Sequence, residues 1–139
     1  MPPKFVFAPT FDNYAALALS VAAGIPADTN PAGDIFGGWL MAQMDLSAGT
    51  AASDRAMGRT ATVSVSYLNF LRPVKVGDVV SVYTKVIRVG RTSISLEVEA
   101  WAVQRGRNDL HKVTSAEFVM VAIGEDGKPR PVDPVSVAL

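Results

Sequence analysis

A pair of glycines and an isolated aspartate are the residues of this chain whose types and spacing suggest chemistry. A polar turn leads into Gly37 and Gly38, and an apolar segment that carries Asp45 follows them. The first N–H groups of a helix have no partner within the helix, and glycines leave such groups uncovered by side chains. Gly37 and Gly38 are therefore candidates for stabilising an oxyanion.

Asp45 is the candidate general base. Aspartate is a poor helix-interior residue, and the helical neighbours of Asp45, such as Met41 and Gly49, are apolar or small. We expect a partly desolvated carboxylate that removes a proton from water. The alternative is an aspartate on the solvent side of the helix, or one hydrogen-bonded to a neighbouring loop.

The spacing of Gly38 and Asp45 bears on how they would work together. Seven residues separate them, so they share a helix face but lie about 10 Å apart along the axis. A base and an oxyanion donor must each reach the reacting atoms directly or through one water. Asp45 of one chain and the glycine pair of another, on antiparallel helices of a dimer, would meet this requirement.

The sequence lacks the residues that other common catalytic sites require. The single histidine, His111, is not accompanied by a serine-elbow motif, and there is no cysteine. A Ser-His-Asp triad and a zinc site are therefore disfavoured. The glycines do not have the spacing of a phosphate-binding loop or a dinucleotide fingerprint. A carboxylate beside backbone donors remains, with no metal site.

Length and composition predict a single domain over residues 1–139. Thirteen basic residues balance thirteen acidic ones, which disfavours nucleic acid or an anionic membrane as a partner. The chain has no cysteine, no signal-peptide pattern and no apolar stretch long enough to span a bilayer. We expect a soluble, cytoplasmic protein.

The order of the predicted elements is that of an α+β fold. An irregular lead-in at 1–14 precedes a strand at Leu17–Ala23, a loop at 24–35 and a long helix at Phe36–Ser53. After Gly58, apolar residues alternate with polar ones in four strands. The residues of these segments are near 62–67, 80–86, 94–100 and 111–123, with turns at 75–77, 88–91 and 104–109 and an irregular tail at 124–139.

Short turns predict that neighbouring strands form antiparallel hairpins, so the helix would lie on the concave face of a curved sheet of about five strands. One helix cannot cover both faces of such a sheet. We expect association, most simply edge to edge as a homodimer with a continuous sheet.

Three segments resemble one known family in order and spacing. They are the run from Asn30 to Asp45, the run Phe70-Leu-Arg-Pro-Val-Lys-Val-Gly-Asp-Val and the run Gly90-Arg-Thr-Ser-Ile-Ser. Together they resemble the hotdog-fold acyl-CoA thioesterases, most closely the YciA-like bacterial branch, over about residues 17–130. The resemblance implies a hotdog fold, in which a central helix is wrapped by an antiparallel sheet, and dimers that often assemble into hexamers.

The resemblance also implies roles for single residues. Asp45 matches the family's catalytic carboxylate, and Asn30 matches an asparagine that positions water or substrate. Gly37 and Gly38 match the helix N-terminus that polarises the thioester carbonyl. Many relatives have a histidine before the glycine pair, where this chain has Phe36, so a histidine contact to the carbonyl is excluded here.

Several residues near strand ends are candidates for binding coenzyme A. Arginines are suited to its phosphates, and small polar residues to its pantetheine arm. The alternatives are a solvated surface charge for each arginine, the start of a strand for Thr92 and Ser93, and a simple turn residue for Asn30. We expect Trp39 and Phe70 to be core or interface residues. The candidate coenzyme A residues are Arg72, Arg88, Gly90, Arg91, Thr92 and Ser93.

The predicted activity is hydrolysis of acyl-CoA to a free acid and coenzyme A, with Asp45 as general base or as nucleophile and with no cofactor. A non-catalytic acyl-CoA binding or assembly module is one alternative, because binding needs a groove but no base. A hotdog dehydratase is the other, although it would need a histidine near the helix.

Overall fold

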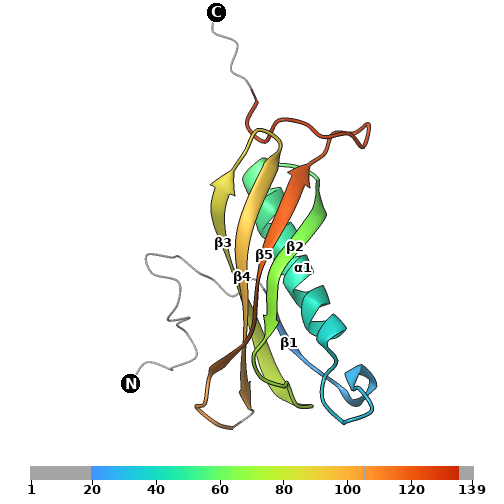
Figure 1. Ribbon diagram of the computed structural model, residues 1–139, viewed down its shortest axis with the longest axis vertical. Helices are drawn as coiled ribbons and strands as arrows, with labels where there is room; N and C mark the ends of the chain where they lie inside the picture. The colour runs from blue at the N-terminus through green and yellow to red at the C-terminus, as the bar shows by residue number, and fades with distance from the viewer. Residues whose placement is uncertain (1–19, 105, 135–139) are drawn as a thin grey trace, which may run out of the picture.

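The computed structural model of the chain describes residues 20–104 and 106–134, which form one long helix, a short 3-10 helix and five strands. The strands make one antiparallel sheet in the order β1-β3-β4-β5-β2. The predicted hotdog arrangement is confirmed, with the helix lying along the inside of the curved sheet (Figure 1). The bounds are β1 Ser20–Ala23, the 3-10 helix Pro26–Asp28, α1 Gly37–Ala56, β2 Thr60–Phe70, β3 Asp78–Val89, β4 Ser93–Gln104 and β5 His111–Ala122.

Small side chains bring α1 close to the sheet. Its sequence is rich in alanine and has no proline, which favours a long helix. Two large apolar residues, Leu40 and Met44, are buried at the N-terminal half, whereas alanines form most of the buried face beyond them. The buried residues of α1 are Leu40, Met44, Ser47, Ala48, Ala52 and Ala56.

The central strands supply the other half of the core. In β4, every second residue from Ile94 to Ala102 is fully buried, as expected for a strand face covered by a helix. Phe118 and Met120 of β5 and Val82 of β3 are buried beside them. This core fixes the position of α1, and therefore of Asp45, over the sheet.

The predicted hairpins are confirmed for β3–β4 and β4–β5, whose strands are neighbours in the sheet. The hairpin predicted around residues 75–77 is wrong, because β2 pairs with β5 and not with β3. The connection 71–77 must pass two intervening strands, a span of about 14 Å at the usual strand spacing. An extended connection of that length can reach about 23 Å, and its Val74 is fully buried.

The alternation of apolar and polar residues in β2 does not correspond to a buried face, unlike that in β4. The apolar residues of the β2 alternation, Val63, Val65 and Tyr67, are all exposed. Two register shifts interrupt the pairing of β2 with β5. Within the described residues β2 is an outer strand of the sheet, so one of its edges is open for pairing.

The remaining predicted bounds agree closely with the structure. The helix begins one residue later and ends three residues later than predicted, at Gly37 and Ala56. Ser20–Ala23 is a strand, whereas the rest of the predicted first strand and the predicted lead-in at 1–14 lie outside the described residues. Residues 124–134 contain no helix or strand, as predicted for the tail, while 135–139 lie outside the described part. No described helix is both long and apolar enough to cross a membrane.

Residues 124–134, the tail, connect the end of the sheet to the C-terminus of α1. Arg130 donates a hydrogen bond to the carbonyl of Ala56, the last residue of the helix, over 2.9 Å. A Cβ at Gly58 would lie 2.5 Å from Arg130 Nη2, so Gly58 leaves room for this contact. Arg55 and Asp133 form an exposed bidentate pair, and the hydrogen bond from Arg55 lowers the pKa of the Asp133 carboxyl.

We expect Arg130→Ala to lower the free energy of unfolding by about 1–2 kcal/mol, because the variant leaves the carbonyl at the helix C-terminus without its charged donor. Denaturant titration followed by circular dichroism measures this difference. Lys128→Ala, at an exposed position of the same tail, is the matched control. Equal losses in the two variants would contradict a capping role for Arg130.

Candidate active site

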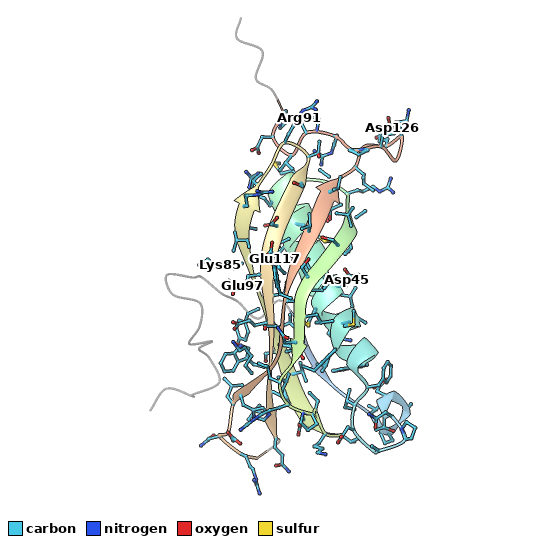
Figure 2. The ribbon with its side chains drawn as sticks, in the orientation of Figure 1. Asp45, Lys85, Arg91, Glu97, Glu117 and Asp126 are labelled. Carbon is cyan, nitrogen blue, oxygen red and sulfur yellow. The ribbon has the colours of Figure 1, made fainter. Side chains whose placement is uncertain are left out.

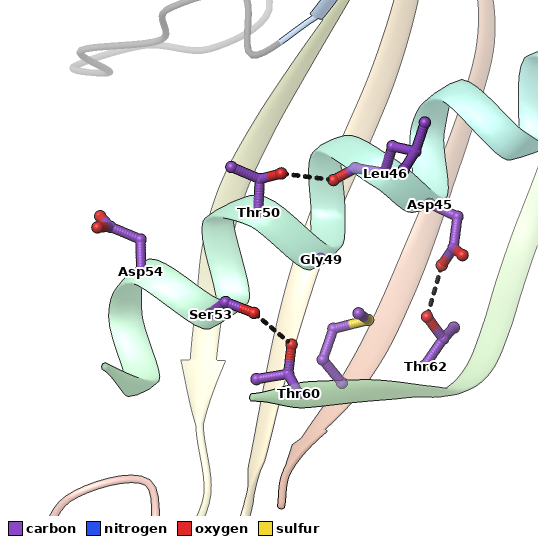
Figure 3. Close-up of a pocket in the computed structure, with 9 residues that line it drawn as sticks. Asp45, Leu46, Gly49, Thr50, Ser53, Asp54, Thr60 and Thr62 are labelled. Carbon is purple, nitrogen blue, oxygen red and sulfur yellow. Dashed lines mark hydrogen bonds between the residues drawn. The ribbon is translucent and has the colours of Figure 1, made fainter. Parts of the chain in front are cut away.

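Asp45 lies on the wall of an open groove between α1 and β2 (Figure 3). The groove has a volume of about 720 Å³, which is within the range of small-molecule sites. We call it the Asp45 groove. Its lining residues are Asp45, Leu46, Gly49, Thr50, Ser53, Asp54, Thr60, Thr62 and Met120.

A hydrogen bond from β2 holds the Asp45 carboxylate. Thr62 Oγ1 donates to Asp45 Oδ1 over 2.5 Å, and the two side chains point toward each other in Figure 3. Asp45 is exposed in the single chain, so the predicted desolvation of its carboxylate is wrong for one protomer. Its open side faces the groove, where a carboxylate can accept a proton from water.

Sequence reasoning missed Thr62. The available signal was the alternation of β2, which predicts that the Thr62 and Val63 side chains point to opposite faces of the strand. That pattern does not reveal that β2 runs beside the middle of α1. The position of β2 relative to the helix depends on the order of the strands in the sheet. The structure brings Thr62 to Asp45 from 17 positions away in the sequence.

Hydroxyl groups continue along the Asp45 groove toward the C-terminus of α1. Ser53 Oγ and Thr60 Oγ1 are 3.0 Å apart and join the helix to the start of β2. Thr50 Oγ1 donates to the carbonyl of Leu46 one turn back. Neither bond involves Asp45, so these hydroxyls shape the groove without occupying the carboxylate.

A second groove lies at the N-terminus of α1 and contains Asn30, Gly37 and Arg72. We call it the Gly37 groove. The N-cap residue, Phe36, makes no side-chain hydrogen bond to the first turn. The helix N-terminus therefore keeps N–H groups that can interact with an anion or a polarised carbonyl. The other lining residues are Asp34, Ile35, Leu40, Phe70, Leu71, Pro73 and Val74.

Asn30 shapes the loop that precedes α1. Its Oδ1 accepts hydrogen bonds from the backbone N–H groups of Ala32 and Asp34, at 2.9 and 3.1 Å. Gly33 within this turn has a φ of +85°, a conformation that favours glycine. Asn30 is thus a turn residue, and it also lines the Gly37 groove. Asp34 is paired with Lys75 on the connection that follows β2.

The glycine pair is crowded by two phenylalanines. A Cβ at Gly37 would lie 2.9 Å from Phe70 Cζ, and one at Gly38 would lie 3.0 Å from Phe36 Cε2. Phe70 is half exposed and lies over the first turn of the helix, so it is a groove residue rather than a core residue. Trp39 packs against the core, as predicted.

The predicted coenzyme A residues fall into two groups. Arg72 lies in the Gly37 groove. The others lie at the β3–β4 hairpin, where the Arg91 carbonyl accepts a hydrogen bond from Val132 of the tail and the Thr92 carbonyl accepts one from Ala122 at the end of β5. Figure 2 shows Arg91 at the end of the sheet, well beyond Asp45. One chain therefore does not bring the two groups together. The hairpin residues are Arg88, Gly90, Arg91, Thr92 and Ser93.

Other titratable residues lie outside the two grooves. His111 is the first residue of β5, and its Nδ1 is 3.2 Å from the carbonyl of Asp109. Burial raises the pKa of the Tyr83 phenol on β3. In the described part of the chain no group of three or more histidine, cysteine, aspartate or glutamate residues could hold a metal ion.

Comparison with known proteins places this geometry in a family. The family model of the thioesterase superfamily matches residues 32–107, a span that contains Gly37, Gly38, Asp45 and Thr62. The chain belongs to the thioesterase superfamily. A protein named acyl-CoA thioester hydrolase YciA from Salmonella typhimurium is 49% identical over 111 residues, which cover 78% of this chain and 84% of that protein.

Solved structures of this superfamily resemble the fold closely. HI0827, described as a hexameric broad-specificity acyl-coenzyme A thioesterase, has a TM-score of 0.81 and 38% identity in an aspartate-to-alanine variant. The match covers 86% of this chain and 88% of that one. The hexameric thioesterase y2039 from Yersinia pestis has a TM-score of 0.80 and 42% identity, with 84% and 95% of the chains covered.

We expect Gly37→Ala to be coupled to Phe70. The added Cβ must displace the ring, whereas in a Phe70→Ala background it meets no ring and the better helix former is tolerated. The coupling in the free energy of unfolding should be about 1 kcal/mol, measured by denaturant titration of the four proteins of the cycle. Gly38→Ala, which faces Phe36, is the control and should show no coupling to Phe70.

Proposed function

We propose that this chain is an acyl-CoA thioester hydrolase that converts acyl-CoA and water to a free carboxylic acid and coenzyme A. The observation that carries the proposal is Asp45, held by Thr62 on the wall of an open groove. Two relatives named acyl-CoA thioester hydrolase YciA, which are 49% and 47% identical to this chain, support it. Acyl-CoA is the substrate, and the reaction needs no separate cofactor.

Asp45 acts on water in the proposed mechanism. As a general base it removes a proton from a water molecule, which attacks the thioester carbonyl carbon. The carbonyl oxygen gains negative charge, and the thiolate of coenzyme A leaves when the tetrahedral intermediate collapses. Direct attack by the Asp45 carboxylate, with hydrolysis of the resulting anhydride, is the other form of the proposal. Thr62 orients the carboxylate in both.

The helix N-terminus receives the charge on the carbonyl oxygen. The N–H of Gly38 donates to that oxygen, and Gly37 allows the turn that presents it. Asn30 holds the adjoining loop through its two hydrogen bonds and faces the same groove. These residues line the Gly37 groove, whereas Asp45 lines the other groove of the chain.

A homodimer would complete each site. About 10 Å of helix separates Gly38 from Asp45, which is too far for both to act on one carbonyl. Edge-to-edge pairing through β2 would place two α1 helices antiparallel on one continuous sheet, so that Asp45 of one chain approaches the glycine pair of its partner. The exposed apolar residues of β2 support this interface. They are Val63, Val65, Tyr67 and Phe70.

The same two-fold arrangement would also assemble the binding site for coenzyme A. Arg72 and the β3–β4 hairpin lie at opposite ends of one chain, and an antiparallel dimer brings opposite ends of two chains to the same side. Arg72, Arg88 and Arg91 then bind phosphates, while Gly90, Thr92 and Ser93 contact the pantetheine arm. Since HI0827 and y2039 are described as hexameric, we propose a trimer of dimers. A location in the cytoplasm stays a prediction of the sequence.

We expect Asp45→Asn to lower kcat for acyl-CoA hydrolysis by about 100-fold or more, because the amide cannot accept the proton of water. A thiol reagent measures coenzyme A release from hexanoyl-CoA. Asp126→Asn changes an exposed carboxylate of the tail that lines neither groove and is the control, expected to keep near-normal turnover. Saturable binding without thiol release by the unaltered protein would instead indicate a binding module.

Subunit mixing tests the shared site. Asp45→Asn and Gly37→Val should each be inactive, the first for lack of a base and the second because the side chain blocks the helix N-terminus. Denatured together and refolded, the two variants should regain hydrolysis, since a mixed dimer has one site with neither change. Activity no greater than the sum of the separately refolded variants would contradict a site built from two chains.

A further inference from the structure

Gly49 is a glycine in the interior of α1 that neither the backbone nor the packing of this chain requires. It lies four residues after Asp45 on the same groove wall. Its φ is not in the left-handed region, unlike those of Gly33 and Gly77. Alanine is a better helix former than glycine at such a position, so the glycine needs another explanation.

The contacts around Gly49 leave space for a side chain. Within 4 Å of an ideal Cβ at this position lies Met120 Cε, at an ordinary van der Waals distance of 3.6 Å. By contrast, a Cβ at Gly24 would lie 2.3 Å from Ile35. Close packing thus explains Gly24 and does not explain Gly49. The missing side chain opens the Asp45 groove down to Met120.

The charges of the groove indicate which half of the substrate it takes. Asp45 and Asp54 are its charged residues, and none of its lining residues is basic. Such a lining disfavours the phosphates of coenzyme A. The Gly37 groove contains Arg72 and Asp34. Because Asp34 is paired with Lys75, the charge of this groove is more suitable for phosphate than that of the Asp45 groove. The groove beyond Asp45 is therefore the place for the acyl chain, and its floor is the thioether of Met120.

We propose that Gly49 determines the acyl-chain specificity of the enzyme. The acyl chain leaves the thioester at Asp45 and runs along α1 toward Ser53, passing over Gly49 about 6 Å farther along the helix axis. An acetyl group ends before Gly49, whereas a hexanoyl chain crosses it and contacts Met120. The inference rests on the proposed function, because it assigns the acyl half of the same substrate.

The geometry predicts a graded series at this position. Gly49→Ala adds one methyl group that fits against Met120, and it should lower the ratio of kcat/KM for hexanoyl-CoA to that for acetyl-CoA a few-fold. Gly49→Leu fills the groove and should lower the same ratio by about tenfold or more, as expected for loss of a hydrophobic subsite. A general loss of activity lowers kcat/KM for both substrates and therefore cancels in this ratio.

The experiment measures thiol release with acetyl-CoA, hexanoyl-CoA and palmitoyl-CoA for Gly49→Ala and Gly49→Leu, with size-exclusion chromatography of each. Lys128→Leu, at an exposed position of the tail that lines neither groove, is the control and should keep the ratio. An unchanged ratio in both Gly49 variants, or a change of oligomeric state in Gly49→Ala, overturns the proposal. In the second case, Gly49 serves subunit packing.

Failure of this proposal is distinguishable from failure of the proposed function. If the unaltered protein releases coenzyme A through Asp45 and Gly49 variants keep its chain-length profile, the specificity assignment is wrong and the hydrolase assignment stands. If the unaltered protein releases no thiol from any of the three substrates, the hydrolase assignment itself is wrong.

Discussion

The close packing of α1 on the concave face of the sheet is the constraint on which the rest of the structure depends. Alanines form most of the buried helix face beyond Met44, so the helix axis lies near the strands, and residues beside that face come within reach of β2. Thr62 can therefore reach Asp45, and Ser53 can reach Thr60. Larger side chains on the buried face would hold the helix farther from the sheet, and both contacts would be lost.

The same packing divides the chemistry between two grooves. The helix crosses the sheet with its N-terminus at the Gly37 groove and its middle at the Asp45 groove. A helix is rigid, so no adjustment within one chain shortens the separation of about 10 Å between Gly38 and Asp45. The open edge of β2 and its exposed apolar residues offer the physical route by which a second chain supplies the missing half.

The two grooves also differ in charge, and this difference gives the proposed substrate a direction. Arg72 marks the Gly37 groove as the side that accommodates phosphate, whereas Asp45 and Asp54 mark the other groove as the side that excludes it. A thioester has one charged arm and one apolar arm. A site with this asymmetry binds it in one orientation, with the carbonyl between the helix N-terminus and the carboxylate.

Local sequence determined the elements of this protein and several of its candidate residues. The glycine pair, the alanine-rich helix and the alternation of β4 follow from backbone propensity and periodicity, which act over a few residues. The sheet order was decided only by the tertiary structure, because the connection 71–77 reads as a turn in sequence but crosses two strands. That order places Thr62 at Asp45 and leaves β2 at an edge. Sequence reasoning could therefore propose Asp45 but could not find its partner, since a contact between residues far apart in the chain depends on how the strands are arranged.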